Sequence, residues 1–271
     1  MKKNIAATVL LTTVGGLAAY SNATPELESQ LDKTTILANR SLTHLSKVGS
    51  SVTILDVKEL EQSGVFHIDE ALKFVPGAVS ESTGGQRGTI SSIFLRGTAT
   101  RHAHFRVDGM RLSGANISSG NFLGGANLSG LSRIEVLLGP QSALYGGDSI
   151  GGVIGLYSKR GEGEPGGRVE LEAGSHQTHR SIVDFQGKLD QLSYSLSVGY
   201  LKTENDLPNN DYEQFSQSLR LDYQVNDKLD IGLTLRAFQA DLRRPNYADP
   251  GFARAADDHT DSTLATIYAE L

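Results

Sequence analysis

The second half of the chain alternates between apolar and polar residues, and this alternation restricts its fold more than any other feature. From 194 to 200, Tyr, Leu, Val and Tyr stand at every second position, with serine or glycine between them. The runs over 218–225 and 229–236 alternate in the same way. A period of two places successive side chains on opposite faces of a β-strand. We therefore expect a sheet with one apolar and one polar face.

Two kinds of fold contain such a sheet. In a membrane β-barrel the apolar face contacts lipid and the polar face looks inward. In a soluble β-sandwich the apolar face packs on a second sheet. Periodicity alone does not separate them, but connection lengths favour the barrel. Tight connections at 189–192 and 225–229 alternate with long polar ones at 202–214 and 240–261, as turns and loops alternate around a membrane barrel.

The alternation predicts six antiparallel transmembrane strands: Arg168–Ala173, Arg180–Lys188, Leu192–Leu201, Phe215–Val225, Leu229–Gln239 and Ser262–Leu271. A barrel that encloses its own plug has about 22 strands, and hydrocarbon does not tolerate an open sheet edge. The sequence thus predicts an incomplete barrel, and we expect the chain to be an N-terminal fragment or a truncated gene product.

Residues 47–160 carry mixed signals that predict an α+β domain. Short helices are expected at Val57–Gln62 and Ile68–Phe74, and strands at Ser51–Asp56, Ile134–Leu138 and Ile150–Tyr157. Gly139-Pro140 ends one of these strands, because proline cannot donate to a ladder. Glycine-rich residues 161–167 are interpreted as a flexible linker to the strands at 168–271.

The N-terminus is predicted to be a targeting segment. Lys2 and Lys3 precede a short apolar run, and Ser21-Asn22-Ala23 supplies small residues for cleavage, so residues 1–23 are interpreted as a secretory signal peptide. The apolar run is shorter than the ~20 residues of a membrane span. Residues 24–46 are polar and without sustained period, and we expect them to be mobile.

Composition excludes several functions. The net charge of −6 argues against nucleic acid as a partner. The absence of cysteine excludes disulfides and thiolate metal sites. His102 and His104 are spaced to share one face of a strand, but no carboxylate nearby completes a metal site, and we interpret them as surface polar residues. No catalytic spacing stands out, so we expect no enzyme.

The stretch LSRIEVLLGPQSALYGGDSIGGVIGLYSK, residues 131–159, resembles the end of the plug domain of TonB-dependent outer-membrane receptors. It departs from the family pattern at Leu138, where arginine is usual, and at 155–157. The segment Ser91–Gly97, SSIFLRG, resembles the cobalamin-receptor branch of the family. The family usually has apolar residues at His104 and Arg106, so we expect a more exposed strand there.

The resemblance implies a site for the periplasmic protein TonB. Residues 32–40, DKTTILANR, resemble the TonB box, an extended segment suited to strand addition at a sheet edge. The implied TonB-binding residues are Asp32, Lys33, Thr34, Thr35, Ile36 and Leu37. The other implied contacts of the receptor are outer-membrane lipid and a ligand.

Ligand and metal sites are implied by the same resemblance. Carried over by position, the substrate-binding residues are Ile90, Ser92, Ala99, Ile117 and Ser118. Cobalamin receptors also order two outer loops with calcium, which prefers oxygen ligands. The matching acidic residues are Asp206, Asp211, Asp249 and Asp261, with Asp257 and Asp258 beside them. No other cofactor is expected.

The sequence therefore predicts a receptor in the outer membrane of a Gram-negative bacterium that takes up a scarce, large nutrient with energy from TonB. A corrinoid such as cobalamin is the expected ligand, and a ferric siderophore is the alternative. A passive porin would lack the plug and the TonB box. A secreted soluble β protein is the third interpretation.

Overall fold

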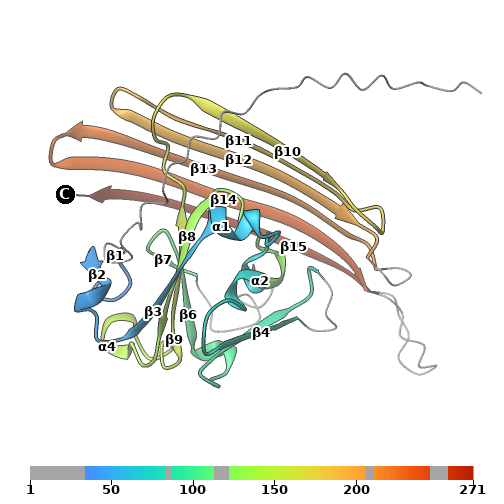
Figure 1. Cartoon of the computed structure of the whole chain (residues 1–271), viewed down its shortest axis with the longest axis horizontal. Coiled ribbons are helices and arrows are strands. Elements are labelled where there is room, and N and C mark those ends of the chain that lie inside the picture. The colour runs from blue at the N-terminus through green and yellow to red at the C-terminus, as the bar shows by residue number, and fades with distance from the viewer. Residues whose placement is uncertain (1–33, 83–86, 113–121, 206–209, 245–255, 271) are drawn as a thin grey trace, which may run out of the picture.

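The computed structural model describes residues 34–82, 87–112, 122–205, 210–244 and 256–270. An N-terminal domain of short strands and helices lies against one face of a large curved sheet (Figure 1). The predicted signal peptide, residues 1–23, lies outside the described residues. Within the described part of the chain, no helix is long and apolar enough to cross a membrane.

The N-terminal domain is built on a five-stranded sheet in the order β3-β8-β9-β6-β7. Its strands are β3 (Ser51–Asp56), β6 (Ala103–Val107), β7 (Met110–Arg111), β8 (Leu131–Leu138) and β9 (Gly152–Ser158). The β6–β9 pair is parallel and the other pairs are antiparallel. Since β9 is central and apolar, its side chains lie in the core.

Short helices and two hairpins surround this sheet. The α-helices are α1 (Val57–Gln62), α2 (Ile68–Leu72) and α4 (Ser142–Tyr145), and 3₁₀ turns are η2 (Leu45–Lys47) and η4 (Thr100–His102). The hairpins pair β1 (Thr34–Thr35) with β2 (Thr43–His44), and β4 (Ala78–Ser82) with β5 (Ser91–Leu95). Helix α1 begins where predicted because the Asp56 side chain accepts hydrogen bonds from its first turn.

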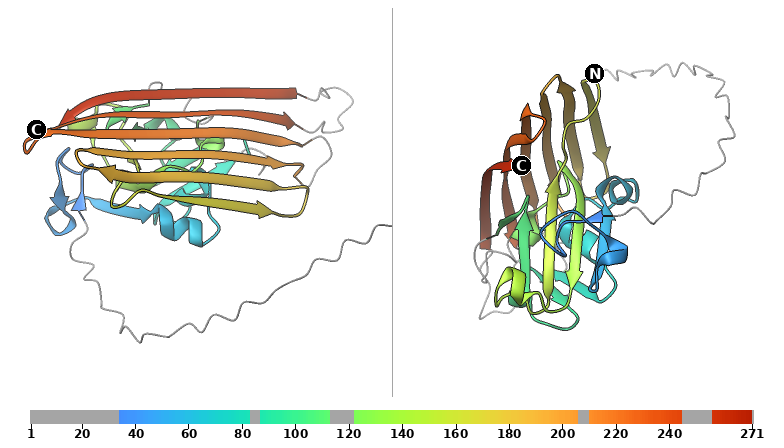
Figure 2. Two further views of the ribbon diagram at one scale, coloured as in Figure 1. Left: turned by 90° about the horizontal axis from the view of Figure 1, so that it is seen from above. Right: turned by 90° about the vertical axis from the view of Figure 1, so that its left-hand side faces the viewer.

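The six predicted strands are present in one antiparallel sheet, with neighbours in chain order. They are β10 (Gly166–Ala173), β11 (His179–Leu189), β12 (Leu192–Thr203), β13 (Tyr212–Asn226), β14 (Leu229–Arg244) and β15 (Ala256–Glu270). The tight turns lie at one end of the sheet and the long connections at the other (Figure 2). The β1–β2 hairpin lies toward the tight-turn end (Figures 1 and 2).

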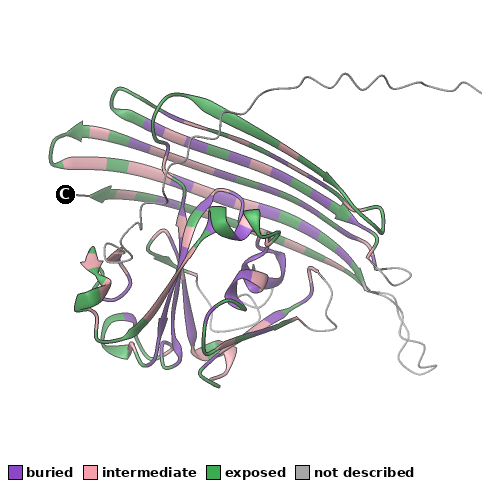
Figure 3. Cartoon of the chain, in the orientation of Figure 1, coloured by how far each residue is buried: buried purple, intermediate pink, exposed green. Residues whose placement is uncertain are grey.

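The two faces of this sheet differ in what they contact. Buried and exposed positions alternate along β12 and the first half of β13 (Figure 3). On β12, the serines at 193, 195 and 197 are buried against the N-terminal domain, whereas Leu196 and Tyr200 are exposed on the other face. A sandwich would bury the apolar set instead. The structure therefore favours the membrane-wall interpretation that periodicity alone left open.

Polar and charged side chains join the N-terminal domain to the sheet. Asn127 Nδ2 donates to Ser216 Oγ at 2.7 Å, and Arg236 Nη2 donates to the Ser129 carbonyl at 2.8 Å. Near α1, Arg168 of β10 forms an ion pair of 3.0 Å with Glu61. These contacts fix the domain on the serine-rich face.

Three sequence expectations differ from the structure. The β6 strand is buried rather than exposed: His104 is 4% accessible and packs on Tyr145, with 5.7 Å between ring centroids. His102 lies in η4, outside β6, so the two histidines do not share a strand face. The linker is also not free, because Gly161 is buried and Gly166 already belongs to β10.

Candidate functional site

The N-terminal segment Thr34–Leu37 is packed on the N-terminal domain through one carboxylate. Glu135 Oε2 accepts hydrogen bonds from Thr35 Oγ1 at 2.7 Å, from the Ile36 amide at 3.0 Å and from the Leu37 amide at 3.2 Å. Thr35 is fully buried and Leu37 is 2% accessible. The sequence predicted a mobile segment here, and the structure shows its described part bound to β8.

The surroundings of Glu135 explain why this carboxylate tolerates complete burial. Its other oxygen lies 2.9 Å from Arg133 Nη2, and a buried charge needs such a partner. Tyr145 donates its hydroxyl hydrogen to the Leu37 carbonyl at 2.7 Å. Burial raises the pKa of Tyr145 above its ordinary value, so the phenol keeps the proton that it donates.

Of the six residues predicted to bind TonB, the structure describes Thr34, Thr35, Ile36 and Leu37; Asp32 and Lys33 lie outside the described residues. Sequence reasoning did not find Glu135, which is about 100 positions away along the chain. The signal that could have found it is a carboxylate inside an otherwise apolar strand, since such groups are buried only with partners.

The predicted substrate residues border the β4–β5 hairpin. Ile90 is exposed, and Ser92 and Ala99 are half-buried. The Ile93 amide donates to Thr100 Oγ1 at 3.0 Å, so the segment after β5 folds back beside the strand. This brings Ala99 toward the strand that holds Ser92. Ile117 and Ser118 lie outside the described residues.

A buried aspartate fixes that hairpin, and sequence reasoning missed it. Asp69 Oδ2 accepts hydrogen bonds from Ser82 Oγ at 3.0 Å and from Ser91 Oγ at 3.1 Å. Asp69 is 8% accessible and lies in the first turn of α2. It therefore joins α2 to the ends of both strands beside the connection between them.

The predicted calcium ligands that the structure describes lie at the long-connection end of the sheet, where a hollow of about 540 Å³ is lined by Asp211, Asp241, Asp257 and Asp258 among others. Asp211 is paired with Arg243 at 2.8 Å and Asp261 with His259 at 2.9 Å. No cluster of three acidic or histidine side chains suited to a metal occurs among the described residues. Asp206 and Asp249 lie outside them.

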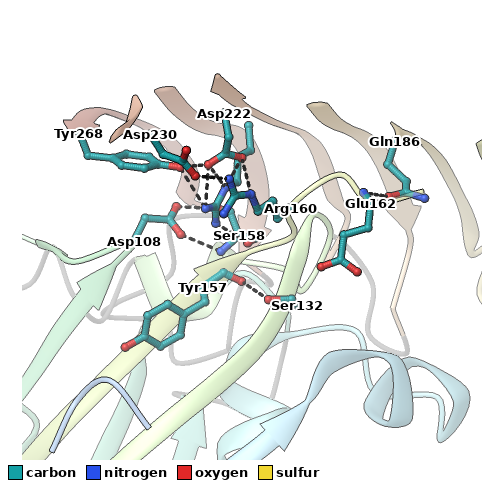
Figure 4. Close-up of polar contacts among 11 residues, drawn as sticks. Asp108, Ser132, Tyr157, Ser158, Arg160, Glu162, Gln186, Asp222, Asp230 and Tyr268 are labelled. Carbon is teal, nitrogen blue, oxygen red and sulfur yellow. Dashed lines mark hydrogen bonds and ion pairs between the residues drawn. The ribbon is translucent and has the colours of Figure 1, made fainter. Parts of the chain in front are cut away.

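At the opposite end, charged residues join the N-terminal domain to the sheet (Figure 4). Arg160 Nη2 donates to Asp230 Oδ2 at 2.8 Å, and its Nε lies 3.7 Å from Asp222 Oδ2. The hydrogen bond to Asp230 raises the pKa of the Arg160 guanidinium, which therefore stays charged. Arg220 of β13 donates to the Ser158 carbonyl at 2.9 Å.

Comparison with known families agrees with this architecture. Residues 44–153 match the family described as TonB-dependent Receptor Plug Domain. They include the five-stranded sheet up to the start of β9, the helices that cover it and the β4–β5 hairpin. Residues 44–153 are therefore a plug domain of the kind found in TonB-dependent receptors, and the relatives that carry this domain are outer-membrane proteins of Gram-negative bacteria.

Two relatives that match part of the chain are both named as vitamin B12 transporters. Over 150 residues the chain is 39% identical to the "Vitamin B12 transporter BtuB" of Vibrio vulnificus strain YJ016, covering 55% of this chain and 23% of that protein. Over 171 residues it is 35% identical to the protein of that name from strain CMCP6, covering 63% of this chain and 27% of that protein. The chain thus spans about a quarter of the length of these relatives.

Solved structures share the fold at lower identity. The ferripyoverdine receptor of the outer membrane of Pseudomonas aeruginosa superposes with a TM-score of 0.71 at 20% identity, over 88% of this chain and 33% of that one. The ferric yersiniabactin uptake receptor FyuA of Yersinia pestis gives 0.61 at 21% identity, over 80% and 36%. The predicted fold, a plug followed by antiparallel wall strands, is confirmed.

Proposed function

We propose that this chain forms the plug and wall strands of a receptor that takes up cobalamin with energy from TonB. The observation that carries the proposal is the burial of Thr35 and Leu37 on the plug. This segment resembles the TonB box, and its backbone amides are occupied by Glu135. A partner strand pairs with the amides of every second residue, so strand addition needs at least one of these two adjacent amides. Binding of TonB therefore competes with the contact to the plug.

The cobalamin assignment is supported by the vitamin B12 transporters, which are 35–39% identical over the matched residues. The β5 sequence SSIFLRG adds to it. Ser91 of this strand donates a hydrogen bond to Asp69, and the next residue, Ser92, is half-buried near the β4–β5 connection. In the proposed receptor, Ile90, Ser92 and Ala99 contact the ligand together with Ile117 and Ser118.

A ferric siderophore is the second candidate. An anionic iron chelate needs cationic groups, and Arg101 of the plug is exposed. Arg87 is less available, because its guanidinium lies 3.8 Å from Glu70. The siderophore-receptor structures are about 20% identical to this chain and so support the fold alone.

Calcium is proposed as a structural ion of the long connections. Asp211, Asp257, Asp258 and Asp261 would supply oxygen ligands together with Asp206 and Asp249. Arg243 and His259 now neutralise part of this set, so calcium would have to displace these cations. If calcium orders these loops before ligand binds, the loops lose less conformational entropy on binding, and ligand binding is tighter.

The test is equilibrium binding of cobalamin to the receptor in detergent, with calcium and with chelator. We expect calcium to tighten binding by roughly tenfold, and Asp211→Asn to reduce that gain. Asp227→Asn, the same substitution in an exposed tight turn at the other end of the sheet, is the control. If the receptor bound a ferric chelate tightly and cobalamin not detectably, the cobalamin assignment would be refuted, but the assignment to a TonB-dependent receptor would remain.

A further inference from the structure

Six consecutive residues, 158–163, are each held in place where the plug leaves its last strand. The Ser158 amide and hydroxyl donate to Asp108 at 2.7 and 2.6 Å. The Lys159 amide donates to the Gly130 carbonyl at 2.9 Å. Arg160 reaches the aspartates of β13 and β14 described above. The residues that lead into the expected linker, 161–167, are thus bonded both to the plug and to the sheet.

The remaining three residues lie against β11 and β12. Gly161 is buried so tightly that a Cβ would collide with the carbonyl oxygens of Tyr194 and Gly187. The Glu162 amide donates to Gln186 Oε1 at 2.8 Å. The Gly163 carbonyl accepts from the Lys188 amide at 2.9 Å. Residues 158–163 therefore have contacts at every position.

The charges at this junction balance. Asp222 is 2% accessible and lies 3.0 Å from Arg220 Nε and 3.7 Å from Arg160 Nε. Asp230 neutralises Arg160 from β14. Tyr268 of β15 donates its hydroxyl hydrogen to Asp222 and accepts a hydrogen bond of 3.0 Å from Arg220 Nη2. Side chains of three sheet strands thus meet the end of β9 (Figure 4).

The two ends of the plug are held very differently. At the N-terminal segment, Glu135 and the Tyr145 hydroxyl make the side-chain hydrogen bonds, and all of these partners belong to the plug itself. At 158–163, the partners include β11, β12, β13 and β14 of the sheet. A pull on the N-terminal segment therefore acts first on contacts within the plug and last on the contacts that join the plug to the sheet.

We propose that Arg160, Asp222, Asp230 and Arg220 form an anchor that keeps the C-terminal end of the plug on the wall while the N-terminal segment is under tension. Arg160 is a positioning residue, because it acts by holding Ser158 and β9 against the sheet. The role under tension rests on the proposed TonB-dependent function, whereas the anchor itself is a property of the resting receptor. Breaking it should loosen residues 158–163 without unfolding the sheet.

Hydrogen exchange of the receptor in detergent tests the anchor without TonB or ligand. We expect Arg160→Gln and Asp230→Asn each to speed exchange of the 158–163 amides by roughly three- to tenfold. The double variant should add little to either single change, since both remove the same contact. Lys159→Gln removes an equal charge from the adjacent exposed side chain and is the matched control. Unchanged exchange of β12 amides shows that the receptor is folded.

Two results would refute the anchor. In the first, the 158–163 amides exchange at the same rate in Arg160→Gln and in Lys159→Gln. In the second, the effects of Arg160→Gln and Asp230→Asn on this rate are additive in the double variant. The role under tension has its own readout, which is entry of a large hydrophilic antibiotic into cells with and without active TonB. Arg160→Gln should raise entry only when TonB is active. Faster exchange with no such rise refutes the role under tension. Absence of any TonB-dependent uptake by the wild-type receptor refutes the proposed function and leaves the exchange result to decide the anchor.

Discussion

Replacing Glu135 should release the N-terminal segment from the plug. Its carboxylate accepts three hydrogen bonds, two of them from backbone amides. A hydrogen bond to a charged group contributes about 1.5–3 kcal/mol, and water recovers part of this when the segment is released. We expect Glu135→Ala to weaken docking by about 3 kcal/mol, which is roughly 100-fold in the docking equilibrium. Glu135→Gln keeps one carbonyl acceptor and should cost about half as much.

Cysteine labelling measures this equilibrium, because the chain contains no cysteine of its own. Ala38 is 8% accessible in the docked segment, so a thiol at Ala38→Cys reacts when the segment detaches. Asn39→Cys, at the exposed neighbouring position, gives the rate for an unprotected thiol. Labelling of Ala38→Cys should approach that rate when Glu135→Ala is added.

The matched control is Glu81→Ala, which removes a glutamate from an exposed position of β4. It should leave the labelling rate of Ala38→Cys unchanged. Equal labelling rates in the Glu135 and Glu81 variants would refute the reasoning, because the carboxylate would then not hold the segment. Slow labelling in both would mean that Tyr145 and the packing of Leu37 are sufficient.

Two further predictions concern the same domain. Ile36→Pro removes an amide that Glu135 occupies and that strand addition requires, so uptake should stop while ligand binding at the cell surface persists; undiminished uptake would place the TonB box elsewhere. Burial, followed by the charges of Arg106 and Arg111, lowers the pKa of His104 to about 4. The unfolded chain therefore takes up this proton first, and plug stability should fall by about 3 kcal/mol between pH 6.5 and 4. Pulse proteolysis should show this loss, and His104→Leu should reduce it.

The sequence predicted the bounds of strands and helices well where a residue in the chain itself marks the boundary. Strand β3 and helix α1 have the predicted bounds, because Asp56 ends one and caps the other. All six wall strands were found, but β13 and β14 extend beyond the predicted ends. Their ladder continues from Tyr212–Leu242 at one end to Asn226–Leu229 at the other. Cross-strand pairing carries polar residues into strands that alternation alone would end earlier.

Long-range contacts were not predictable in the same way. The linker was expected to be flexible from its glycines, yet Gly161 serves close packing against β11 and β12. His104 was expected to be exposed because it is polar, but the five-stranded sheet encloses β6 on both sides. Glu135 and Asp69 act through partners far away in sequence or on another element. Each of these cases depends on tertiary neighbours, about which a local pattern carries no information.

The interface between plug and wall changes character along the barrel axis. At the long-connection end, wall residues Tyr212, Phe238 and Leu242 join the apolar core of the plug. Midway, the Ser216 hydroxyl and the Arg236 guanidinium of the wall meet the Asn127 side-chain amide and the Ser129 carbonyl of the plug. At the tight-turn end, Arg160 and the wall aspartates provide ionic contacts. Apolar burial is insensitive to moderate salt, whereas partly exposed ion pairs are screened within about 10 Å at 0.1 M. The end of the plug that lies nearest the proposed TonB site is therefore the end whose attachment depends on ionic conditions, and the end toward the proposed ligand site is held by packing.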